Sequence, residues 1–178
     1  VKLSYINNRL GLSLDYFELI KRKIALNLYD LFKTNKIDNL TRDKRIVDEL
    51  DKSFIGFISK DNAFLNMRNL RKGKVYESID KRYVNYNIFG KFNNRERFYT
   101  IPNNINLNDY NRIKIHIAEG PFDILSILYN LRKEEYHNLY TSIGGSGYLN
   151  IIKYFLLDMK LYNVEFHIYM DNDQDINK

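Results

Sequence analysis

Three acidic residues occupy positions where carboxylates can gather around one cation. Glu119 directly follows the alternating segment IKIHIA, and Asp171 and Asp173 follow a second alternating segment, VEFHIYM. Clustered carboxylates repel one another, and a bound cation relieves this repulsion. Hard oxygen ligands suit Mg²⁺ or Mn²⁺, which bind through a few carboxylates together with substrate phosphates and water. The pattern therefore indicates metal-assisted phosphoryl-transfer chemistry.

Each of these acidic elements also has an ordinary structural explanation. Glu119 can cap a helix, and the Asp-Asn-Asp sequence at 171–173 can form a simple turn. The placement of all three acids directly after strand-like segments favours the metal site over these explanations.

The elements that position the acids alternate between strand and helix from Ile113 onward. The strand-like segments are IKIHIA, LYTSI and VEFHIYM, and the helix-like segments between them are PFDILSILYNLRK and SGYLNIIKYFLLDMK. Such alternation predicts a parallel, Rossmann-like sheet. Ligands of these sheets collect beyond the carboxyl ends of the strands, where the three acids are expected to lie.

Small residues are expected at the same edge of the sheet. Gly120 permits a tight turn after Glu119, and Pro121 suits the first position of the following helix. Asp123, at the third helical position, can cap the helix, support the site or bind the metal directly. A second loop near the site contains Gly144, Gly145 and Ser146, and either phosphate approach or a plain turn explains it.

The front of the chain has a different character. Candidate N-caps at Ser4 and Ser13, a candidate C-cap at Gly11 and an apolar stripe predict helices up to about residue 50. Short aromatic-rich runs predict a small antiparallel sheet over residues 53–102, with a hairpin turn at residues 60–62. Residues 105–112 are expected to connect two lobes. The predicted fold class is α+β, with a basic α/β N-terminal lobe at residues 1–110 and a parallel-sheet lobe at residues 111–178.

Charge divides between the same two parts. Residues 1–110 hold 21 Lys and Arg against 13 Asp and Glu, and residues 111–178 hold 7 against 9. A basic surface beside a carboxylate site is typical of proteins that bind polyanions. The many Lys, Asn, Ile and Tyr residues also fit a plain AT-rich coding bias.

Composition excludes several other classes of protein. The chain has no cysteine, which excludes disulfides and cysteine-ligated zinc. It has no apolar run of the roughly 18 residues that a membrane span needs, and its start lacks the apolar region of a secretory signal. We expect a cytoplasmic protein with no membrane partner.

The strings IHIAEGPFDILSIL, TSIGGSG and HIYMDND together resemble the Toprim domain of bacterial-type and phage primases. That domain has a strand ending in Glu-Gly-x-x-Asp, a middle strand ending in a small-residue loop, and a strand ending in Asp-x-Asp. Residues 113–175 cover most of this pattern. The resemblance implies that Glu119 is catalytic, that Asp171 and Asp173 bind the metal, and that Asp123 is the helix aspartate of the family.

A second similarity lies in the basic lobe. RYVN at residues 82–85, followed by FGK at residues 89–91, is similar to the Lys-Tyr-x-Asn and aromatic-x-Lys motifs that precede Toprim, with Arg replacing Lys. The segment ending at Arg68 resembles the family's Gly-Phe-x-x-Arg region, and YINNRLGL resembles its early Arg-Gly segment. Tyr83 and Asn85 are explained equally well as plain sheet residues. By this resemblance, the residues that contact template or nucleotide are Arg68, Arg82, Tyr83, Asn85 and Lys91.

The resemblance implies a DNA primase core that makes short RNA primers for DNA replication, of phage type, in the host cytoplasm. Its substrates are single-stranded DNA and ribonucleoside triphosphates, its cofactor is Mg²⁺ or Mn²⁺, and a replicative helicase is the expected partner. The sequence departs from the family in two ways. A full Toprim fold continues beyond the Asp-x-Asp strand, and the zinc module of many primases has no counterpart here, so no zinc is expected.

Two other functions remain open from the sequence. A Toprim nuclease or topoisomerase-like enzyme would cleave DNA at the same acids, and the primase-like basic lobe argues against it. A non-catalytic module that binds single strands would need only the basic, tyrosine-rich lobe. The presence of all three acids argues against that module.

Overall fold

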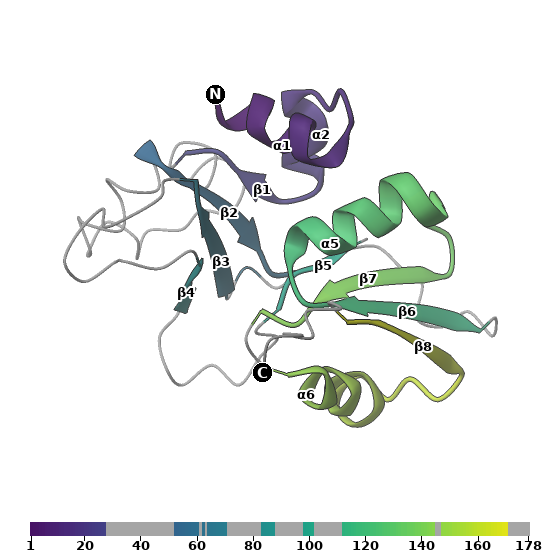
Figure 1. Cartoon of the computed structure of the whole chain (residues 1–178). Coiled ribbons are helices and arrows are strands. Elements are labelled where there is room, and N and C mark those ends of the chain that lie inside the picture. The colour runs from purple at the N-terminus through teal and green to yellow at the C-terminus, as the bar shows by residue number, and fades with distance from the viewer. Residues whose placement is uncertain are drawn as a thin grey trace, which may run out of the picture. The chain divides into compact units, whose positions relative to one another are not determined.

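Helices combine with two separate sheets in the computed structural model, which confirms the α+β class (Figure 1). The structure describes residues 1–27, 52–60, 62, 64–70, 83–87, 98–101, 112–144 and 147–170. The chain divides into two compact units, Val1–Tyr99 and Thr100–Lys178. The first contains an antiparallel sheet, and the second contains a mixed sheet with parallel strands.

The first unit has a four-stranded sheet in the order β1-β2-β3-β4, with two helices before it. Its elements are α1 (Lys2–Leu10), α2 (Tyr16–Lys21), β1 (Ile24–Ala25), β2 (Phe54–Ile58), β3 (Phe64–Asn69) and β4 (Tyr83–Asn87). The predicted hairpin between β2 and β3 is confirmed, because these strands pair antiparallel and Asn62 adopts a left-handed φ of 62° between them. The predicted helices after residue 27 lie outside the described residues.

Local signals explain where the two helices of this unit begin and end. Gly11 ends α1 in the left-handed region, with φ 67°, and Asp15 caps α2 by accepting a hydrogen bond from the Glu18 N–H at 2.8 Å. The side chain of Asn7 holds the connection, since it donates to the Leu14 carbonyl at 2.9 Å and accepts from the Leu14 N–H at 2.8 Å. The predicted C-cap at Gly11 is therefore confirmed. The predicted N-caps are wrong, because Ser4 lies inside α1 and Asp15, not Ser13, precedes α2.

The core of the first unit forms where helix residues meet the sheet. Ile6 and Leu19 are fully buried, as are Phe57 and Tyr99, whose ring centroids lie 5.4 Å apart. The Tyr99 hydroxyl donates to the backbone carbonyl of Arg22 after α2. Burial of aromatic side chains of this size supplies much of the stabilisation of a small sheet.

The second unit has a four-stranded sheet in the order β5-β7-β6-β8. Its elements are β5 (Thr100–Ile101), β6 (Ile113–Ala118), α5 (Pro121–Ser126), η2 (Ile127–Arg132), β7 (Asn138–Ser142), α6 (Tyr148–Lys153), η3 (Tyr154–Asp158) and β8 (Val164–Tyr169). Strand β6 pairs in parallel with both β7 and β8, whereas β5 pairs antiparallel with β7. The π-helical turns η2 and η3 continue α5 and α6, so the two predicted helices form as longer continuous segments.

One short strand differs from the prediction. Thr100 and Ile101 were expected to continue the antiparallel sheet of the front lobe, but they join the second sheet, opposite Thr141 and Tyr140. The Thr100 and Thr141 hydroxyls form a buried hydrogen bond of 3.1 Å. Most of the predicted connector at residues 105–112 lies outside the described residues.

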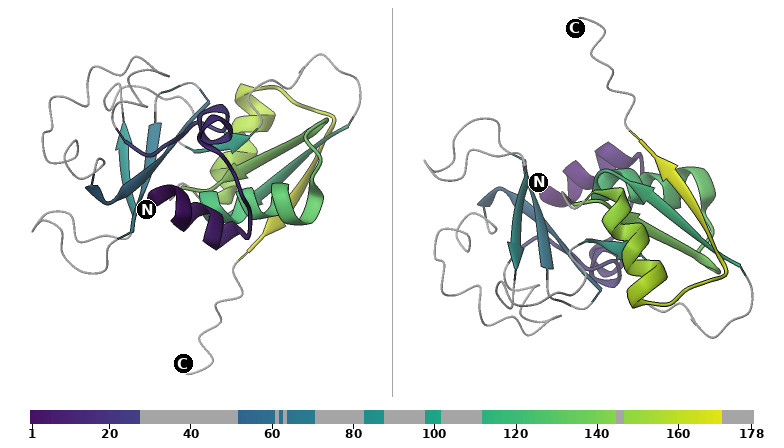
Figure 2. Two further views of the ribbon diagram at one scale, coloured as in Figure 1. Left: turned by 90° about the horizontal axis from the view of Figure 1, so that it is seen from above. Right: turned by 90° about the horizontal axis from the view of Figure 1, so that it is seen from below.

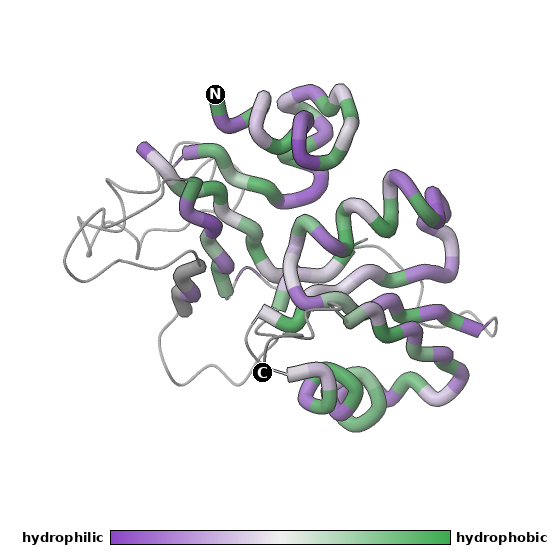
Figure 3. The backbone as a smooth tube through the Cα atoms, in the orientation of Figure 1, coloured by the Kyte–Doolittle hydropathy of each residue, from purple (hydrophilic) through white to green (hydrophobic). Residues whose placement is uncertain are grey.

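Helices cover both faces of the second sheet. Figures 1 and 2 show α5 and α6 on opposite sides of it, and Figure 3 shows hydrophobic and hydrophilic residues alternating along its strands. Ile115 and Ile117 are fully buried on one face of β6, and Leu125 of α5 and Ile151 of α6 are fully buried within the unit. Within the described ranges, no helix is long and apolar enough to cross a membrane.

The left-handed Gly11 generates a prediction. Gly11→Ala should lower the free energy of unfolding by about 1 kcal/mol, because a Cβ is disfavoured at positive φ. A Cβ built there meets nothing within 4 Å, so the cost is one of backbone conformation. Urea titration measures it. Gly11→Asn is the control and should lose less, because Asn tolerates this region; equal losses would assign the effect to something other than φ.

Candidate functional site

Glu119 lies at the carboxyl end of β6, directly before the turn into α5. Its side chain is exposed. Gly120 is extended, with φ −127° and ψ 162°, and Pro121 takes the first helical position, as predicted. The Asp123 carboxylate accepts a hydrogen bond from the Gly120 N–H at 3.1 Å. Asp123 therefore caps the helix and restrains the turn that carries Glu119, which is the capping alternative considered for it.

The ends of three strands meet at the edge of the sheet that bears Glu119. Ala118 and Tyr169 form the last residue pair between β6 and β8, and the Ile143 N–H donates to the Ala118 carbonyl at 2.9 Å. The residues that follow these strands are Glu119 after β6, Ile143 and then Gly144 after β7, and Met170 after β8. The structure thus brings together Glu119, Gly120 and Gly144 of the predicted site.

Gly144 follows β7 with a left-handed φ of 56°. Glycine adopts this conformation without strain and lets a ligand approach the backbone. The remaining predicted residues of this edge, Gly145, Ser146, Asp171 and Asp173, lie outside the described residues. Among the described residues there is no group of three His, Cys, Asp or Glu side chains that could hold a metal ion.

In the first unit, neighbouring strands bring together three of the residues matched to primases. Arg68 of β3 pairs with Tyr83 of β4, and Asn66 pairs with Asn85. The Asn66 side-chain amide donates to the Asn85 side-chain carbonyl at 2.5 Å. Asn85 is exposed, whereas Arg68 is only 5% exposed. Arg82 and Lys91 lie outside the described residues.

Tyr5 of α1 is half-buried between two arginines. The Arg9 guanidinium donates to the Tyr5 hydroxyl at 3.0 Å, and Arg68 interacts with the same hydroxyl. Burial alone raises the pKa of Tyr5, but the hydrogen bonds and charges of Arg9 and Arg68 outweigh it, so its pKa is lowered overall. Arg68 is therefore buried and interacts with Tyr5, a contact between β3 and α1 that its place in the sequence did not reveal.

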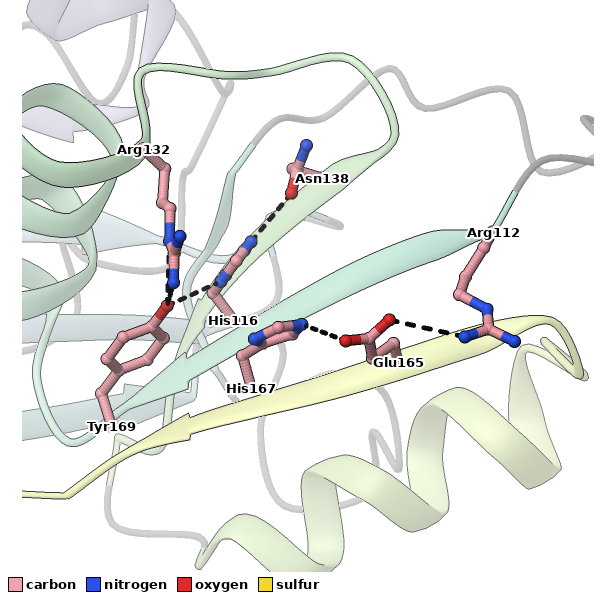
Figure 4. A network of polar contacts seen from close by, with 7 residues as sticks. All are labelled: Arg112, His116, Arg132, Asn138, Glu165, His167 and Tyr169. Atoms are coloured by element: carbon pink, nitrogen blue, oxygen red, sulfur yellow. Dashed lines mark hydrogen bonds and ion pairs between the residues drawn. The ribbon is translucent and has the colours of Figure 1, made fainter.

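A polar network on the second sheet was missed by the sequence analysis (Figure 4). His116 of β6 is 1% exposed, and its ring stacks on Tyr140 with centroids 4.8 Å apart. Its Nε2 lies 2.8 Å from the Asn138 side-chain oxygen, and its Nδ1 lies 3.2 Å from the Tyr169 hydroxyl. Arg132 donates to that hydroxyl through Nε at 3.3 Å and Nη2 at 3.1 Å.

The network has one consistent set of donors. The Asn138 side-chain nitrogen donates to the Tyr136 carbonyl at 2.8 Å, so the Asn138 oxygen faces His116 and must accept. His116 therefore carries its proton on Nε2, and Nδ1 accepts from the Tyr169 hydroxyl. Burial lowers the pKa of His116, the hydrogen bond with Asn138 opposes this in part, and the charges of neighbouring cationic groups lower the pKa further, which keeps the ring neutral at pH 7.

A sequence signal for this network existed. Lys114 and His116 alternate with isoleucines in β6, and Glu165, His167 and Tyr169 alternate with apolar residues in β8. Alternate residues of a strand share one face, so this alternation could have placed the side chains on a common face. The register then sets His116 opposite His167, with ring centroids 5.0 Å apart.

Charged groups at the other end of β8 extend this face. His167 Nε2 lies 2.9 Å from the Glu165 carboxylate, and Arg112 lies 3.6 Å from the same carboxylate (Figure 4). The side chains of Glu165 and Arg112 are 42% and 64% exposed, so such pairs add little to stability.

Comparisons of the chain with protein-family models, curated proteins and solved structures gave no match.

The lowered pKa of His116 predicts how stability depends on pH. Above the ordinary pKa of 6.5, His116 is neutral in both the folded and unfolded states. As the pH falls below 6.5, the unfolded state takes up a proton first, so the free energy of unfolding decreases until the folded pKa is reached. Urea titrations between pH 7.5 and 5 should show this loss, with hydrogen exchange in β6 and β7 as the local readout.

His116→Phe should flatten this dependence, because it keeps a ring against Tyr140 but removes the titrating group. His137→Asn is the matched control: it removes another histidine, and Asn tolerates the left-handed φ of 58° at that position. The assignment of this pH dependence to His116 would be contradicted if stability no longer varied with pH in the His137 variant but still varied as in the wild type in the His116 variant.

Proposed function

We propose that the chain is the catalytic core of a Toprim-type DNA primase, which joins ribonucleotides on a single-stranded DNA template. One observation carries the proposal. Strands β6 and β8 are parallel neighbours whose last pair is Ala118 and Tyr169, so Glu119 follows one strand where Met170 and then Asp171 follow the other. The resemblance to Toprim assigns the catalytic glutamate and the metal-binding aspartates to these positions.

The edge of the sheet suits a divalent metal ion and phosphates. In a Rossmann-like sheet, which we propose for this unit, ligands bind beyond the carboxyl ends of the strands. Glu119 is exposed there on a turn stiffened by Asp123, and Gly144 offers a close approach to backbone. Carboxylates are the donors that Mg²⁺ and Mn²⁺ prefer, and Glu119, Asp171 and Asp173 would hold the ion.

The proposed reaction is attack of a primer 3′-hydroxyl on the α-phosphorus of an incoming ribonucleoside triphosphate, which breaks the bond to the β-phosphate and releases pyrophosphate. A bound Mg²⁺ would neutralise charge on the attacking and leaving oxygens. The protein's own contribution is to align the two substrates, which in general supplies a large part of the rate. The turn at Gly120 and Pro121 serves that alignment, because it limits the positions that the Glu119 carboxylate can take.

The basic first unit is proposed to bind the template. Its sequence carries the chain's positive charge excess, and Asn85, the last residue of the matched motif RYVN, is exposed on β4. Because Arg68 is buried and interacts with Tyr5, we assign it to supporting Tyr5 and the β3–β4 pair instead of an open phosphate contact. Arg82 and Lys91 are then the matched cations left to contact phosphates.

A second candidate function rests on Tyr5. A topoisomerase-like enzyme needs a tyrosine that attacks a DNA phosphate, and neighbouring cations activate such a nucleophile by lowering its pKa. Tyr5 has this environment, between Arg9 and Arg68. In that case Tyr5→Phe would abolish a metal-dependent cleavage of labelled DNA, whereas a primase would retain primer synthesis in the same variant.

Loss of the proposed metal ligands gives the central prediction. Glu119→Gln and Asp171→Asn should each weaken Mn²⁺ binding and lower primer synthesis at least about a hundredfold, because metal assistance contributes several kcal/mol to the transition state. The assay uses single-stranded template, labelled ribonucleotides and Mn²⁺. Asp158→Asn, at an exposed acid of the same unit, is the control and should change neither quantity.

The outcomes separate the candidate functions. Metal-dependent DNA cutting without any oligoribonucleotide would favour the nuclease or topoisomerase-like enzyme. Tight single-strand binding with neither activity would favour a non-catalytic module. Mn²⁺ binding that is equal in the wild type and in Asp171→Asn would remove the proposed metal site.

Template binding gives a prediction of its own. The double variant Arg82→Ala and Lys91→Ala should bind single strands more weakly, with the slope of log affinity against log salt reduced by about 1.4, or about 0.7 for each phosphate contact. Fluorescence anisotropy at several salt concentrations measures the slope. The control removes the exposed Lys52 and Lys153, which changes net charge equally; the same reduction there would assign the effect to overall charge.

A further inference from the structure

Tyr169 is the last residue of β8 and the partner of Ala118 at the end of the parallel ladder. Its hydroxyl lies 3.2 Å from His116 of β6 and accepts from Arg132 at the end of η2 (Figure 4). One side chain of β8 therefore reaches the neighbouring strand and the helix that covers it. This connection lies just before the positions of the proposed metal ligands.

The end of β8 has a particular need for such a connection. Among the strands that the structure describes, β8 has one neighbour, β6, and so it is an edge strand. The last pair of an edge strand is where local opening is easiest, since no second ladder restrains it. Met170, which follows, is 52% exposed. The hydrogen bonds of Tyr169 therefore add side-chain restraint where the backbone ladder ends.

The hydrogen bonds around Tyr169 allow one arrangement only, because each donor and acceptor in the network is fixed. Asn138 accepts from His116, so His116 can only accept from the Tyr169 hydroxyl, which in turn accepts from Arg132. The imidazole is held in place by stacking on Tyr140, which is fully buried. Because its histidine and asparagine are buried and their hydrogen bonds are satisfied, this network fixes one arrangement of its members.

We infer that Tyr169 is a positioning residue, whose hydroxyl holds the carboxyl end of β8 beside that of β6 so that Glu119 and Asp171 meet one metal ion. This inference rests on the proposed metal site and adds to it a residue that the Toprim-like motif does not include. His116 and Arg132 act through Tyr169 and belong to the same device. None of the three is assigned a contact with metal or substrate.

The test compares Tyr169→Phe with Tyr162→Phe. Both substitutions remove only a hydroxyl, and Tyr162 is 83% exposed shortly before the same strand. Tyr169→Phe should weaken Mn²⁺ binding about tenfold, the scale of losing a partner that orients a metal ligand. Tyr162→Phe should bind like the wild type. Hydrogen exchange should accelerate at the end of β8 in Tyr169→Phe and remain unchanged in β7.

Two variants of His116 distinguish positioning from general stability. His116→Gln keeps an acceptor for Tyr169 and a donor for Asn138, so it should retain most of the Mn²⁺ affinity, whereas His116→Leu should lose it. The double variant His116→Leu and Tyr169→Phe should bind Mn²⁺ no more weakly than the weaker-binding single variant. Both substitutions remove the same hydrogen bond, so their effects should not add. Additive losses, or equal losses in the Gln and Leu variants, would overturn the inference.

The result also separates this inference from the proposed function. If Asp171→Asn abolishes Mn²⁺ binding but Tyr169→Phe binds normally, the metal site stands and the positioning role is wrong. If the wild type and Asp171→Asn bind alike, the metal site is wrong and the inference fails with it. Should Tyr169→Phe fold poorly, Arg132→Met removes only the exposed donors to the same hydroxyl. It should weaken Mn²⁺ binding in the same direction by a smaller factor, and normal binding would count against the inference.

Discussion

The parallel pairing of β6 with both β7 and β8 is the constraint on which the second unit depends. Parallel neighbours cannot be joined by a tight turn, so each connection must cross back along the sheet, here through α5 and α6. The crossovers bury both faces and leave the carboxyl ends of three strands at one edge. Glu119 owes its exposed position beside the end of β8 to this arrangement.

The same constraint places polar side chains inside the sheet. Under α5, His116 and Asn138 are buried on adjacent strands, where an unpaired polar group would be costly. Their mutual hydrogen bond, the Tyr136 carbonyl and the Tyr169 hydroxyl satisfy them, and a neutral imidazole is the form that fits. The hydrogen bonds on this face of the sheet therefore determine which atoms donate and which accept.

Much of the second unit was predictable because its strands and helices have strong periodicity. The segment IKIHIA alternates over its whole length, and the Gly120-Pro121 pair marks the helix start, so the strand, the turn and the position of Glu119 followed from the sequence. The β2–β3 hairpin followed for similar reasons. Strand β5 did not, because two residues carry no period and only its partner β7 determines which sheet it joins.

Side-chain roles were harder to predict than elements. The sequence identified Arg68 as a cation near a nucleic-acid motif, but its burial depends on α1, which lies far away in the sequence. The His116 network likewise depends on the register between β6 and β8, which sets residues 53 apart in the chain within hydrogen-bonding distance. Alternation could place these residues on one face, but only the register could bring their atoms together.

The pKa values of Tyr5 in the first unit and Tyr140 in the second are shifted in opposite directions. This difference bears on which of the two hydroxyls can act on a phosphate. Burial, with the nearby charge of Glu134, raises the pKa of Tyr140 to about 12, and its hydroxyl donates to the Glu134 carbonyl. Tyr140 thus stays protonated and structural. Tyr5 lies between Arg9 and Arg68, and its pKa is lowered despite partial burial. Guanidinium groups remain charged at all accessible pH values, so this effect persists wherever the fold does. A phenol held by two permanent cations is suited to a phosphate-rich surface, where it can donate to a phosphate oxygen or, in the second candidate function, attack phosphorus.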